Sequence, residues 1–500
     1  MTRPGLGLEE FQTLGARAAA TPTQTALIET ETGRSLTYGE LNAAVSSVAD
    51  ELQRRWPETN RVGTLFEPAL PFVIAFHAAR RLGWTVVALD TRLSTESVNT
   101  RIAQADVDRV LTEKGTTNAD MTAVSAPVTE VDALLAESDS LTQSEGDMSA
   151  SSDVHSRLES TDSETALILF TSGTTGEQKG VRLTERNLHS SAVASAFRLG
   201  VTPDDCWLCC LPVYHMGGIA PVIRTTLYGT TLVTQRSFET AETARILTDY
   251  DITGVSFVPT QLRRLVDADA PLSALNTVLV GGAPTPDSLR KQALAADVPI
   301  HPTYGMTETA SQIATALPDE VRAYPGTVGH PLYGATITIL SDGEPAKPGD
   351  NGEIVVSGPM VTPGYLNGTG ESFSEWGLHT GDVGYRDSDG RLWVVGRRDD
   401  HIQTGGELVA PQEVCDVLST HPGVYETTVV GIPDEEWGER VGALVVSDGD
   451  VTATALRRYC RDRLPGYKCP KQVAFADALP RTVSGTVDRE AVRELLQTAR

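Results

Sequence analysis

The segment 170–180 holds the residue types that chemistry on phosphate groups requires. It reads Phe-Thr-Ser-Gly-Thr-Thr-Gly-Glu-Gln-Lys-Gly, so four hydroxyls, three glycines and one lysine lie close together. Glycines let backbone N–H groups converge on an anion, and the hydroxyls and lysine add donors and positive charge. The spacing differs from the G-x-x-x-x-G-K-[ST] of the common P-loop. We predict a polyphosphate loop formed by Thr171, Ser172, Gly173, Thr174, Thr175, Gly176 and Lys179; the alternative is a flexible turn.

The segments around this loop predict an α/β protein. An apolar strand at 166–170 leads into the loop, and 38–56 has apolar residues at helical spacing. Further short apolar runs, separated by helical stretches, predict more buried strands at 86–89, 207–211, 254–258 and 278–280. This alternation is typical of mixed, largely parallel sheets.

Two domains are expected, because 500 residues exceed a single hydrophobic core. Strand-rich sequence from about 335 to 395 predicts a β subdomain. A charged break at 396–400 precedes a final α+β unit, so we place a large N-terminal domain at 1–396 and a small, mobile C-terminal domain at 397–500. Between 134 and 165, acids and serines replace the apolar pattern, which predicts an acidic flexible loop.

The charge balance is strongly acidic. Sixty-six acidic residues face 41 basic ones, a formal net charge of −25. Such a chain has no general basic surface for nucleic acid. Self-repulsion of this size is tolerated where salt screens it, so the composition predicts a salt-rich cytoplasm, such as that of a haloarchaeon. An ordinary acidic protein is the alternative.

Cysteine usage and hydropathy exclude two further classes. Six cysteines are too few for a disulfide framework, and the pair Cys206 and Cys209 has no second pair to complete a zinc site. No apolar run approaches the roughly 20 residues of a membrane span, and residues 1–10 show no signal pattern. We expect a soluble cytoplasmic protein with small-molecule partners, no nucleic acid and no membrane span, and a homodimer as the assembly to test.

Four further segments have the composition of a nucleotide site. A glycine pair at 281–282 follows a predicted strand, where glycines permit close approach to a flat ligand. The segment 304–309 combines an aromatic ring, hydroxyls and a carboxylate. Asp382 offers a carboxylate suited to a ribose diol, and 396–400 offers fixed positive charge beside acids. Each of these segments alone is more typical of a turn than of a site.

Together, and in this order, the five segments resemble the motifs of the adenylate-forming superfamily of acyl-CoA ligases, luciferases and peptide-synthetase adenylation domains. The resemblance runs from about residue 38 to residue 489. It implies a large N-terminal domain and a small C-terminal one that rotates between two half-reactions. In the first, a carboxylate attacks the α-phosphate of ATP and pyrophosphate leaves; in the second, the thiol of coenzyme A displaces AMP. ATP, Mg²⁺ and coenzyme A are thereby implied.

The resemblance also implies a role for each matched residue. The implied ATP-binding residues are Thr171, Ser172, Gly173, Thr174, Thr175, Gly176, Lys179, Gly282, Ala283, Pro284, Tyr304, Gly305, Thr307, Asp382 and Arg397. Among them Tyr304 stacks on adenine and Thr307 contacts the α-phosphate, while Asp382 and Arg397 hold the ribose. Glu308 carries Mg²⁺. In the C-terminal part, Asp399 is the implied hinge, and Gly405 and Gly406 line the channel for coenzyme A.

Within the superfamily the sequence is most similar to the 2-succinylbenzoate–CoA ligases of menaquinone biosynthesis. The segments 211–218, 280–284, 304–315 and 405–411 carry this likeness. The implied acyl-substrate residues are His215, Gly281, Thr309, Ser311 and Gln312. For His215 the alternative is a core histidine packed at a strand end. A ligase for another aromatic or medium-chain acid, and a catalytically impaired nucleotide- or acyl-binding homologue, are the alternative functions.

One position departs from the family pattern. Members carry, near the end of the chain, a lysine that bridges the attacking carboxylate and the α-phosphate, and here Thr486 occupies that position. A short neutral side chain cannot supply the charge, and losing such a contact costs on the order of 10² to 10³ in rate. The substitute cations to consider are Lys468, Lys471, Arg481 and Arg489. Slow but sufficient adenylation, and loss of ligase activity, are the other readings.

Overall fold

The computed structural model describes residues 14–134, 164–171 and 179–498, except 116, 367, 369–371, 435, 448 and 482–486. Most of the predicted acidic loop, the greater part of the predicted phosphate loop (172–178) and Thr486 therefore lie outside the described residues. In the part of the chain that is described, no helix is both long and apolar enough to span a bilayer.

The strand that leads into the phosphate loop is central in a largely parallel sheet. In spatial order its strands are β19 (Gly364–Tyr365), β8 (Lys179–Thr184), β7 (Thr165–Thr171), β4 (Thr85–Ala88), β3 (Arg61–Leu65), β5 (Arg109–Thr112) and β6 (Val128–Glu130). β7 pairs in parallel with β4 and antiparallel with β8, and its interior residues are buried. A strand covered on both faces is continuously apolar, which is why the sequence predicted it.

A second sheet brings two predicted nucleotide segments to one edge. Its strands are β15 (His330–Pro331), β14 (Ser311–Thr315), β13 (Ile300–Met306), β12 (Thr277–Val280), β11 (Gly254–Phe257), β9 (Cys206–Cys209), β10 (Thr231–Thr234), β1 (Thr25–Glu29) and β2 (Ser35–Thr37). From β10 through β9, β11 and β12 to β13 the pairing is parallel. Carboxyl ends of parallel strands share one edge, where α/β proteins bind ligands. The residues after β12 and after β13 therefore lie side by side.

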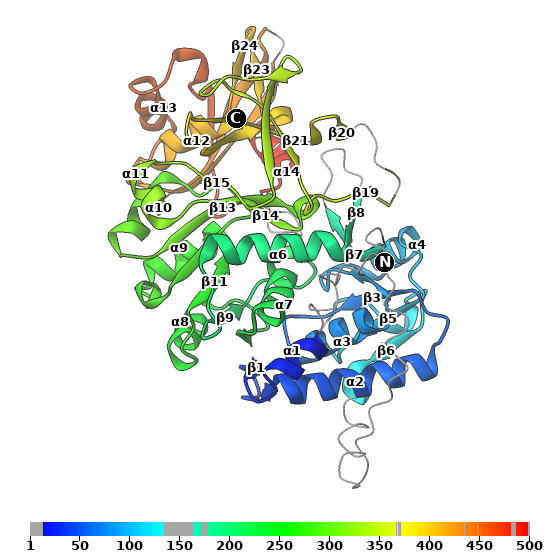
Figure 1. Cartoon of the computed structure of the whole chain (residues 1–500). Helices are drawn as coiled ribbons and strands as arrows, with labels where there is room; N and C mark the ends of the chain where they lie inside the picture. Colours follow the sequence, from blue (N-terminus) through cyan, green and yellow to red (C-terminus); the bar gives the residue numbers. More distant parts are fainter. Residues whose placement is uncertain are drawn as a thin grey trace, which may run out of the picture.

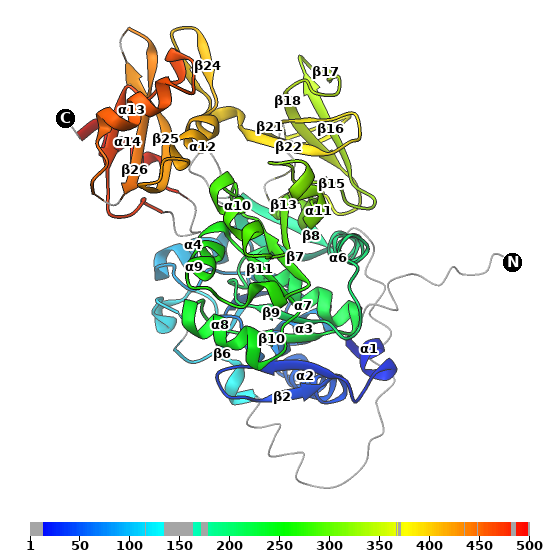
Figure 2. The ribbon, with the colours of Figure 1, turned by 90° about the vertical axis from the view of Figure 1, so that its left-hand side faces the viewer.

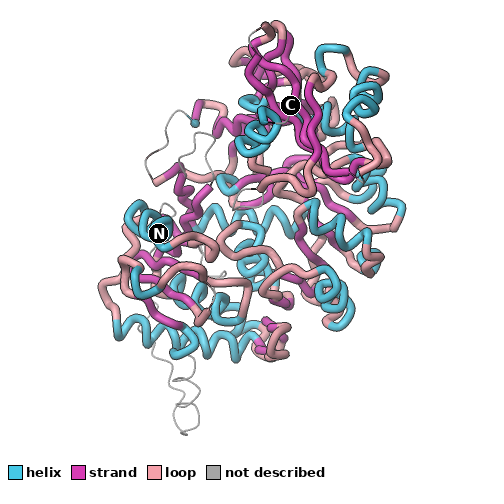
Figure 3. Tube along the Cα trace, turned by 180° about the vertical axis from the view of Figure 1, so that it is seen from behind, coloured by secondary structure: helices cyan, strands magenta, loops and turns pink. Residues whose placement is uncertain are grey.

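Helices cover both sheets (Figures 1 and 3). They are α1 (Leu14–Ala20), α2 (Tyr38–Arg55), α3 (Leu70–Arg81), α4 (Thr95–Gln104), α6 (Glu185–Leu199), α7 (Met216–Tyr228), α8 (Thr240–Asp249), α9 (Pro259–Asp267), α10 (Asp287–Ala295) and α11 (Pro318–Ala323). The helices α12 (Pro411–Ser419), α13 (Ala453–Arg461) and α14 (Arg489–Thr498) pack in the final unit instead. α6 begins at a capping box in which Thr184 and Asn187 exchange hydrogen bonds. α6 and α7 pack against each other and matter most for the site.

The strand-rich stretch folds as a separate sheet, and the final unit forms another (Figure 2). The β subdomain contains β17 (Glu344–Pro345), β16 (Thr336–Ser341), β18 (Gly352–Ser357), β21 (Gly377–Arg386), β20 (Phe373–Ser374) and β22 (Leu392–Arg397). The last sheet contains β24 (Glu407–Val409), β23 (Ile402–Thr404), β26 (Gly438–Ser447), β25 (Val424–Asp434) and β27 (Gln472–Phe475). The predicted fold class is confirmed, whereas the domain boundary after residue 396 stays a prediction.

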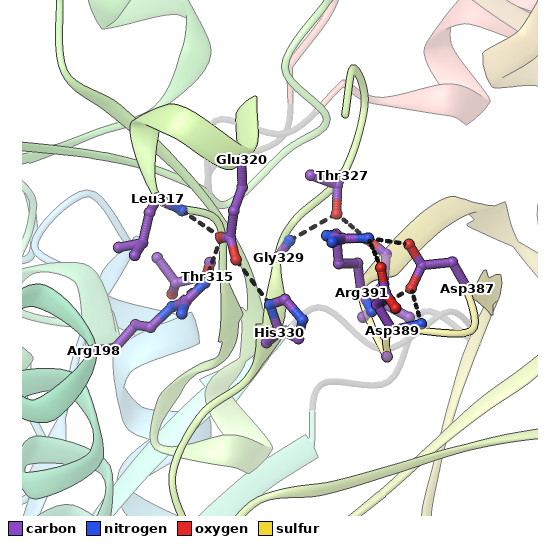
Figure 4. Close-up of polar contacts among 12 residues, drawn as sticks. Arg198, Thr315, Leu317, Glu320, Thr327, Gly329, His330, Asp387, Asp389 and Arg391 are labelled. Carbon is purple, nitrogen blue, oxygen red and sulfur yellow. Dashed lines mark hydrogen bonds and ion pairs between the residues drawn. The ribbon is translucent and has the colours of Figure 1, made fainter. Parts of the chain in front are cut away.

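Polar contacts fasten α6 to the second sheet (Figure 4). Arg198, near the end of α6, donates to the Thr315 carbonyl at 2.9 Å and pairs with Glu320. The other oxygen of the Glu320 carboxylate lies 2.8 Å from His330 Nδ1. One carboxylate thus ties α6, α11 and β15 together, while the Ser191 hydroxyl of α6 donates to the Ala310 carbonyl in the turn that precedes β14, at 2.7 Å.

Candidate active site

The glycine pair after β12 forms an open turn at the sheet edge. A Cβ on Gly281 would lie 2.8 Å from Thr303 Cγ2 on the neighbouring β13, and Gly282 has a φ of +78°. Both positions therefore require glycine, because side chains would clash or strain the backbone. Gly282, Ala283 and Pro284 are exposed. The turn thus presents bare backbone, as predicted for a surface that receives a flat ring.

Three of the residues predicted to bind adenosine come together from distant parts of the chain. The Tyr304 hydroxyl on β13 donates to Asp382 Oδ2 at 2.6 Å. The Arg397 Nε lies 3.7 Å from Asp382 Oδ1, and the strands β21 and β22 pair these two residues in register. Burial raises the pKa of Asp382, while the Tyr304 hydrogen bond and the Arg397 charge oppose that rise. The carboxylate is held between a donor and a cation.

A second cluster lies where the phosphate loop begins and ends. Thr171 and Lys179 face each other across β7 and β8, with the Thr171 hydroxyl 3.5 Å from the Lys179 carbonyl. The Lys179 Nζ lies 5.3 Å from the Tyr365 ring centroid. The Tyr365 hydroxyl in turn donates to Glu308 Oε1 at 3.1 Å. Ser172, Gly173, Thr174, Thr175 and Gly176 lie outside the described residues.

Glu308 is the described residue that fits Mg²⁺. It sits in the 3-10 helix η5 (Thr307–Thr309), directly after β13. Burial raises the pKa of Glu308, and the Tyr365 hydrogen bond and the charges of Arg397 and Lys179 oppose that rise. Among the described residues, no group of three or more His, Cys, Asp or Glu side chains is placed to hold a metal. One carboxylate fits a Mg²⁺ that also binds substrate phosphates, because Mg²⁺ rarely uses an all-protein cage.

Two of the predicted acyl-substrate residues, Thr309 and Gln312, differ in which of their polar atoms remain without a hydrogen bond. The Thr309 hydroxyl accepts from the Met306 N–H at 3.0 Å and lies 2.8 Å from the Ser311 carbonyl, and the residue is 0% exposed. Thr309 therefore holds the turn rather than facing a ligand. Gln312 accepts from the Thr315 hydroxyl at 3.0 Å, while its buried Nε2 has no partner among the described residues. Gln312 thus keeps an unused donor.

The turn itself depends on backbone geometry. A Cβ on Gly305 would lie 1.9 Å from the Ser311 carbonyl oxygen, so glycine alone fits there. Ser311 has a φ of +116°, a conformation that non-glycine residues seldom adopt. Strained backbone of this kind gathers at functional sites. Gly305 and Ser311 therefore shape the site through the main chain.

His215 stands immediately before α7 and is mostly buried. Its ring centroid is 4.9 Å from that of Tyr214, and its Nε2 has no partner among the described residues. Burial lowers the pKa of His215; nearby Asp90 opposes that shift and Arg92 adds to it. The imidazole is therefore neutral near pH 7, with one ring nitrogen left unbonded.

Sequence reasoning missed two residues of this site, Arg224 and Tyr365. Arg224 is the one charged residue of α7, is 6% exposed, and its buried Nη2 has no hydrogen-bond partner among the described residues. Burial lowers the pKa of Arg224. A single charge inside an apolar helix was a usable signal for Arg224, whereas Tyr365 has no local signal, because only the pairing of β19 with β8 brings it to Lys179.

Arg224 borders a gap between α6 and α7, which we call the near gap. Its lining comprises Leu188, Ser191, Ala192, Met216, Ala220, Ile223, Arg224 and Ala310. Ala310 directly follows η5, so the lining of the gap extends from the turn after η5 to the guanidinium. An apolar gap that ends in a cation suits an acid whose far end is anionic.

The C-terminal unit shows what each candidate substitute cation contacts. Lys468 Nζ donates to Glu413 Oε1 at 2.8 Å, Arg481 pairs with Glu426, and Arg489 pairs with Asp400. The Lys471 side chain has no ion pair among the described residues. Three of the four cations are therefore already matched to acids in this arrangement.

The predicted coenzyme A loop lies between β23 and β24. Gly405 has a φ of +58°, and a Cβ there would lie 2.5 Å from the Trp437 ring. Its N–H donates to the Trp437 carbonyl at 2.9 Å. Gly406 also has a positive φ, of +83°. Asp399 falls in the 3-10 helix η7 (Arg398–Asp400), which joins the β subdomain to the last sheet.

Comparison with known proteins places the chain in a family. Residues 14–366 match the family model for AMP-binding enzymes, and residues 413–486 match that for the AMP-binding enzyme C-terminal domain. The chain therefore belongs to the AMP-binding enzyme family, which confirms the resemblance that the motifs indicated.

More specific likenesses follow. A 2-succinylbenzoate–CoA ligase of Bacillus mycoides (strain KBAB4) is 35% identical over 490 residues, covering 96% of this chain and 98% of that protein. The structure of o-succinylbenzoate CoA synthetase from Bacillus subtilis with its acyl-adenylate intermediate superposes with a TM-score of 0.86 and 33% identity, covering 97% of this chain and 98% of that one. The same synthetase with ATP and a magnesium ion gives 0.85 and 32%, over the same shares.

Proposed function

We propose that this enzyme joins 2-succinylbenzoate to coenzyme A through an acyl-adenylate, using ATP and releasing AMP and pyrophosphate. The similar ligase and synthetase support the reaction class. The site supports the choice of acid, because it holds a buried cation with no protein partner at the end of the near gap. The Arg224 guanidinium is the single observation that carries this choice.

A buried guanidinium costs folding free energy unless an anion compensates it. A dicarboxylic acid that is activated at one carboxylate keeps the second one ionised. We assign the second carboxylate to Arg224, with the unused Gln312 Nε2 and His215 Nε2 as further polar contacts of the acid. A monocarboxylic acid would leave the guanidinium uncompensated. This arrangement favours 2-succinylbenzoate over benzoate or octanoate.

The nucleotide end supplies the charge that adenylation needs. The acid's carboxylate attacks the α-phosphate and pyrophosphate leaves, so negative charge must be stabilised on phosphate oxygens. Lys179 offers a fixed cation, and Thr171 and Thr307 offer hydroxyl donors. Mg²⁺ held by Glu308 would neutralise phosphate oxygens there. These groups act by position and charge rather than by covalent chemistry.

The nucleoside would rest on the glycine turn at the edge of the second sheet. The exposed backbone of Gly282 and Ala283 and the ring of Tyr304 would pack against adenine. Asp382, oriented by Tyr304 and Arg397, would accept hydrogen bonds from the ribose hydroxyls. Because β13, β21 and β22 converge on this carboxylate, its direction is fixed before ATP arrives.

Thr486 leaves adenylation without its usual lysine. Lys468, Arg481 and Arg489 would each have to leave an acid partner to replace that lysine. Exchanging one ion pair for another returns little free energy, so Lys471 is the substitute that the structure favours. We propose that adenylation proceeds with Lys471 or at a reduced rate, while the thioester step is unaffected.

The test is formation of coenzyme A thioester at molar KCl with ATP, Mg²⁺ and a matched set of acids. 3-Benzoylpropanoate is the matched control, because it keeps the succinyl arm and the ring but lacks the aromatic carboxylate. Product with 2-succinylbenzoate and little with the control supports the proposal. Equal rates for the two acids would show that Arg224 does not select the substrate. Product with another acid would keep the ligase and change its substrate.

The setting of the enzyme follows from its charge. We propose that it works in a salt-rich cytoplasm, as in a haloarchaeon, because a net charge of −25 is best tolerated where ions screen it. Activity and Tm that rise from low to molar KCl would support this; an optimum at low salt would contradict it. Light scattering at molar KCl would distinguish a monomer from the proposed homodimer.

A further inference from the structure

A second gap, which we call the far gap, continues the groove between α6 and α7 beyond Arg224. It is bordered by the last turns of both helices and by the start of β9, with Ser195, Trp207 and Arg224 among its lining residues. The near gap meets the catalytic turn at Ala310, whereas the far gap opens past the guanidinium on its other side. It therefore lies outside the site described so far.

Three hydrogen-bond donors of the far gap have no acceptor among the described residues. They are Ser195 Oγ, Trp207 Nε1 and Arg224 Nη2, and all three atoms are buried. A buried polar atom without a partner costs about 1 to 3 kcal/mol, and a charged one costs more. Three such atoms around one cavity indicate a missing acceptor rather than three separate defects.

An anion would accept hydrogen bonds from these donors and compensate the charge, whereas water would do only the first. Guanidinium and indole N–H groups only donate, and a water molecule would leave the Arg224 charge uncompensated. Each of three side chains offers one donor atom to the far gap, and the guanidinium supplies the only positive charge among its described lining residues. A single-atom anion with one negative charge satisfies the number of donors and the charge.

The other polar groups of the far gap do not supply that anion. Asp205 lines it, but one carboxylate oxygen accepts from Thr202 and the other from Thr253 and Asn276. No ion pair joins Asp205 to Arg224 in the described part of the chain. The Tyr228 hydroxyl donates to the Ala192 carbonyl. Burial raises the pKa of Tyr228, although Arg224 and the Ser195 side chain oppose that rise, so the phenol is neutral and does not supply an anion.

We propose that the far gap binds a halide ion, chloride in practice, between Ser195 Oγ, Trp207 Nε1 and Arg224 Nη2. The ion compensates the buried guanidinium whenever no acid substrate lies in the near gap. It ties the last turn of α6, the middle of α7 and the start of β9 together. Chloride thus acts as a specific ligand of the folded state, beyond any general screening of the acidic surface.

The first measurement is Tm of the full chain at constant molar ionic strength, with gluconate replaced stepwise by chloride or bromide. We expect a saturable rise in Tm for the native chain. Ser195→Ala and Trp207→Phe should each lose most of that rise. Trp84→Phe, a change at an equally buried tryptophan outside the gap, should keep it. No acid substrate is present, so the result is independent of the proposed ligase activity.

The second measurement locates the ion by bromide anomalous diffraction from crystals of the full chain. A peak within hydrogen-bonding distance of the three donors supports the proposal. A surface peak alone, an adventitious ion only, would overturn it, as would water in the gap with no anomalous signal. A native Tm that responds equally to chloride and gluconate would overturn it as well.

Discussion

The nucleotide end and the acyl end of the site treat buried charge in opposite ways. At the nucleotide end, Glu308 receives a hydrogen bond from Tyr365, and Asp382 is held between Tyr304 and Arg397. At the acyl end, Arg224 makes no contact with an acid, and His215 and Gln312 keep unbonded nitrogens.

The difference indicates which interactions each end of the site leaves for its ligand to supply. ATP brings phosphates to a place where polar and charged protein groups already contact one another. Its binding therefore replaces some of these contacts with contacts to ATP. The acid brings a negative charge to Arg224, which pairs with no acidic side chain among the described residues, so its binding fills a deficit. A buried charge without a partner is costly, and a protein retains one where a ligand supplies the partner. Specificity for the acid is therefore concentrated at the acyl end.

The largest expected loss of activity follows from removing Lys179, the cation at the nucleotide end. Lys179→Ala should lower the rate of pyrophosphate release about 10² to 10³-fold, because the charge acts on the transition state. Lys179→Arg should restore part of it. The exposed Lys114 offers the matched control, and Lys114→Ala should leave the rate unchanged. A loss below threefold at Lys179 would contradict the role that we assign to it.

Removing the cation at the acyl end, Arg224, should instead change the selectivity of the enzyme between acids. Arg224→Met should lower kcat/KM for 2-succinylbenzoate roughly 10²-fold, because a buried charge contact is lost. The same change should scarcely affect 3-benzoylpropanoate, which lacks the second carboxylate. Tm in gluconate should rise, since an uncompensated buried charge is removed. Equal losses for both acids would show that Arg224 acts on structure and not on the substrate.

Restoring the family's lysine would sharpen the comparison at the nucleotide end. Thr486→Lys should raise the rate of pyrophosphate release on the order of tenfold or more, because a point charge returns to the transition state. Conversion of presynthesised acyl-adenylate to thioester should not change. Thr498→Lys adds the same charge on an exposed face of α14 and should have no effect. An unchanged release rate in Thr486→Lys would mean that another cation already does this work.

The smallest expected effect is on stability. Burial raises the pKa of Glu308 above its ordinary value of 4.5, so the folded state binds this proton more tightly than the unfolded state. Stability is then lost as pH rises from about 4.5 through the folded pKa. Glu308→Gln should remove that loss and raise Tm of the ligand-free enzyme by a few degrees at about pH 7, with little change at pH 4. A lower Tm at about pH 7 would show that the carboxylate stabilises the fold.

Patterns of local origin were predictable from the sequence. The helix over 38–56 appears as α2, and the apolar run before the phosphate loop appears as β7. The run at 207–211 ends earlier, at Cys209, and Pro212 follows three residues after that. The glycine pair at 281–282 marked a turn that side chains would not fit: a Cβ on Gly281 would lie 2.8 Å from Thr303 Cγ2, and Gly282 has a φ of +78°. Each signal depends on neighbours within a few residues.

What the sequence could not show has a common physical cause. The role of Thr309 as an acyl-substrate residue stays a prediction, and only the structure shows that its hydroxyl is bonded within its own turn. Tyr365 was not predicted, because its neighbours in sequence indicate only a turn. Whether a polar side chain is free or already bonded depends on partners that arrive from elsewhere in the chain, and composition does not record those partners.

The sequence by itself therefore determined the superfamily, the order of the nucleotide segments and the missing lysine at position 486, because these depend on residue type and spacing. Only the tertiary structure decided which charges are compensated. It joined Lys179 to Glu308 through Tyr365, tied Tyr304 to Asp382 across 78 residues, and left Arg224 alone between two gaps. Burial and pairing depend on distant segments brought together, so residue type and spacing alone did not reveal them.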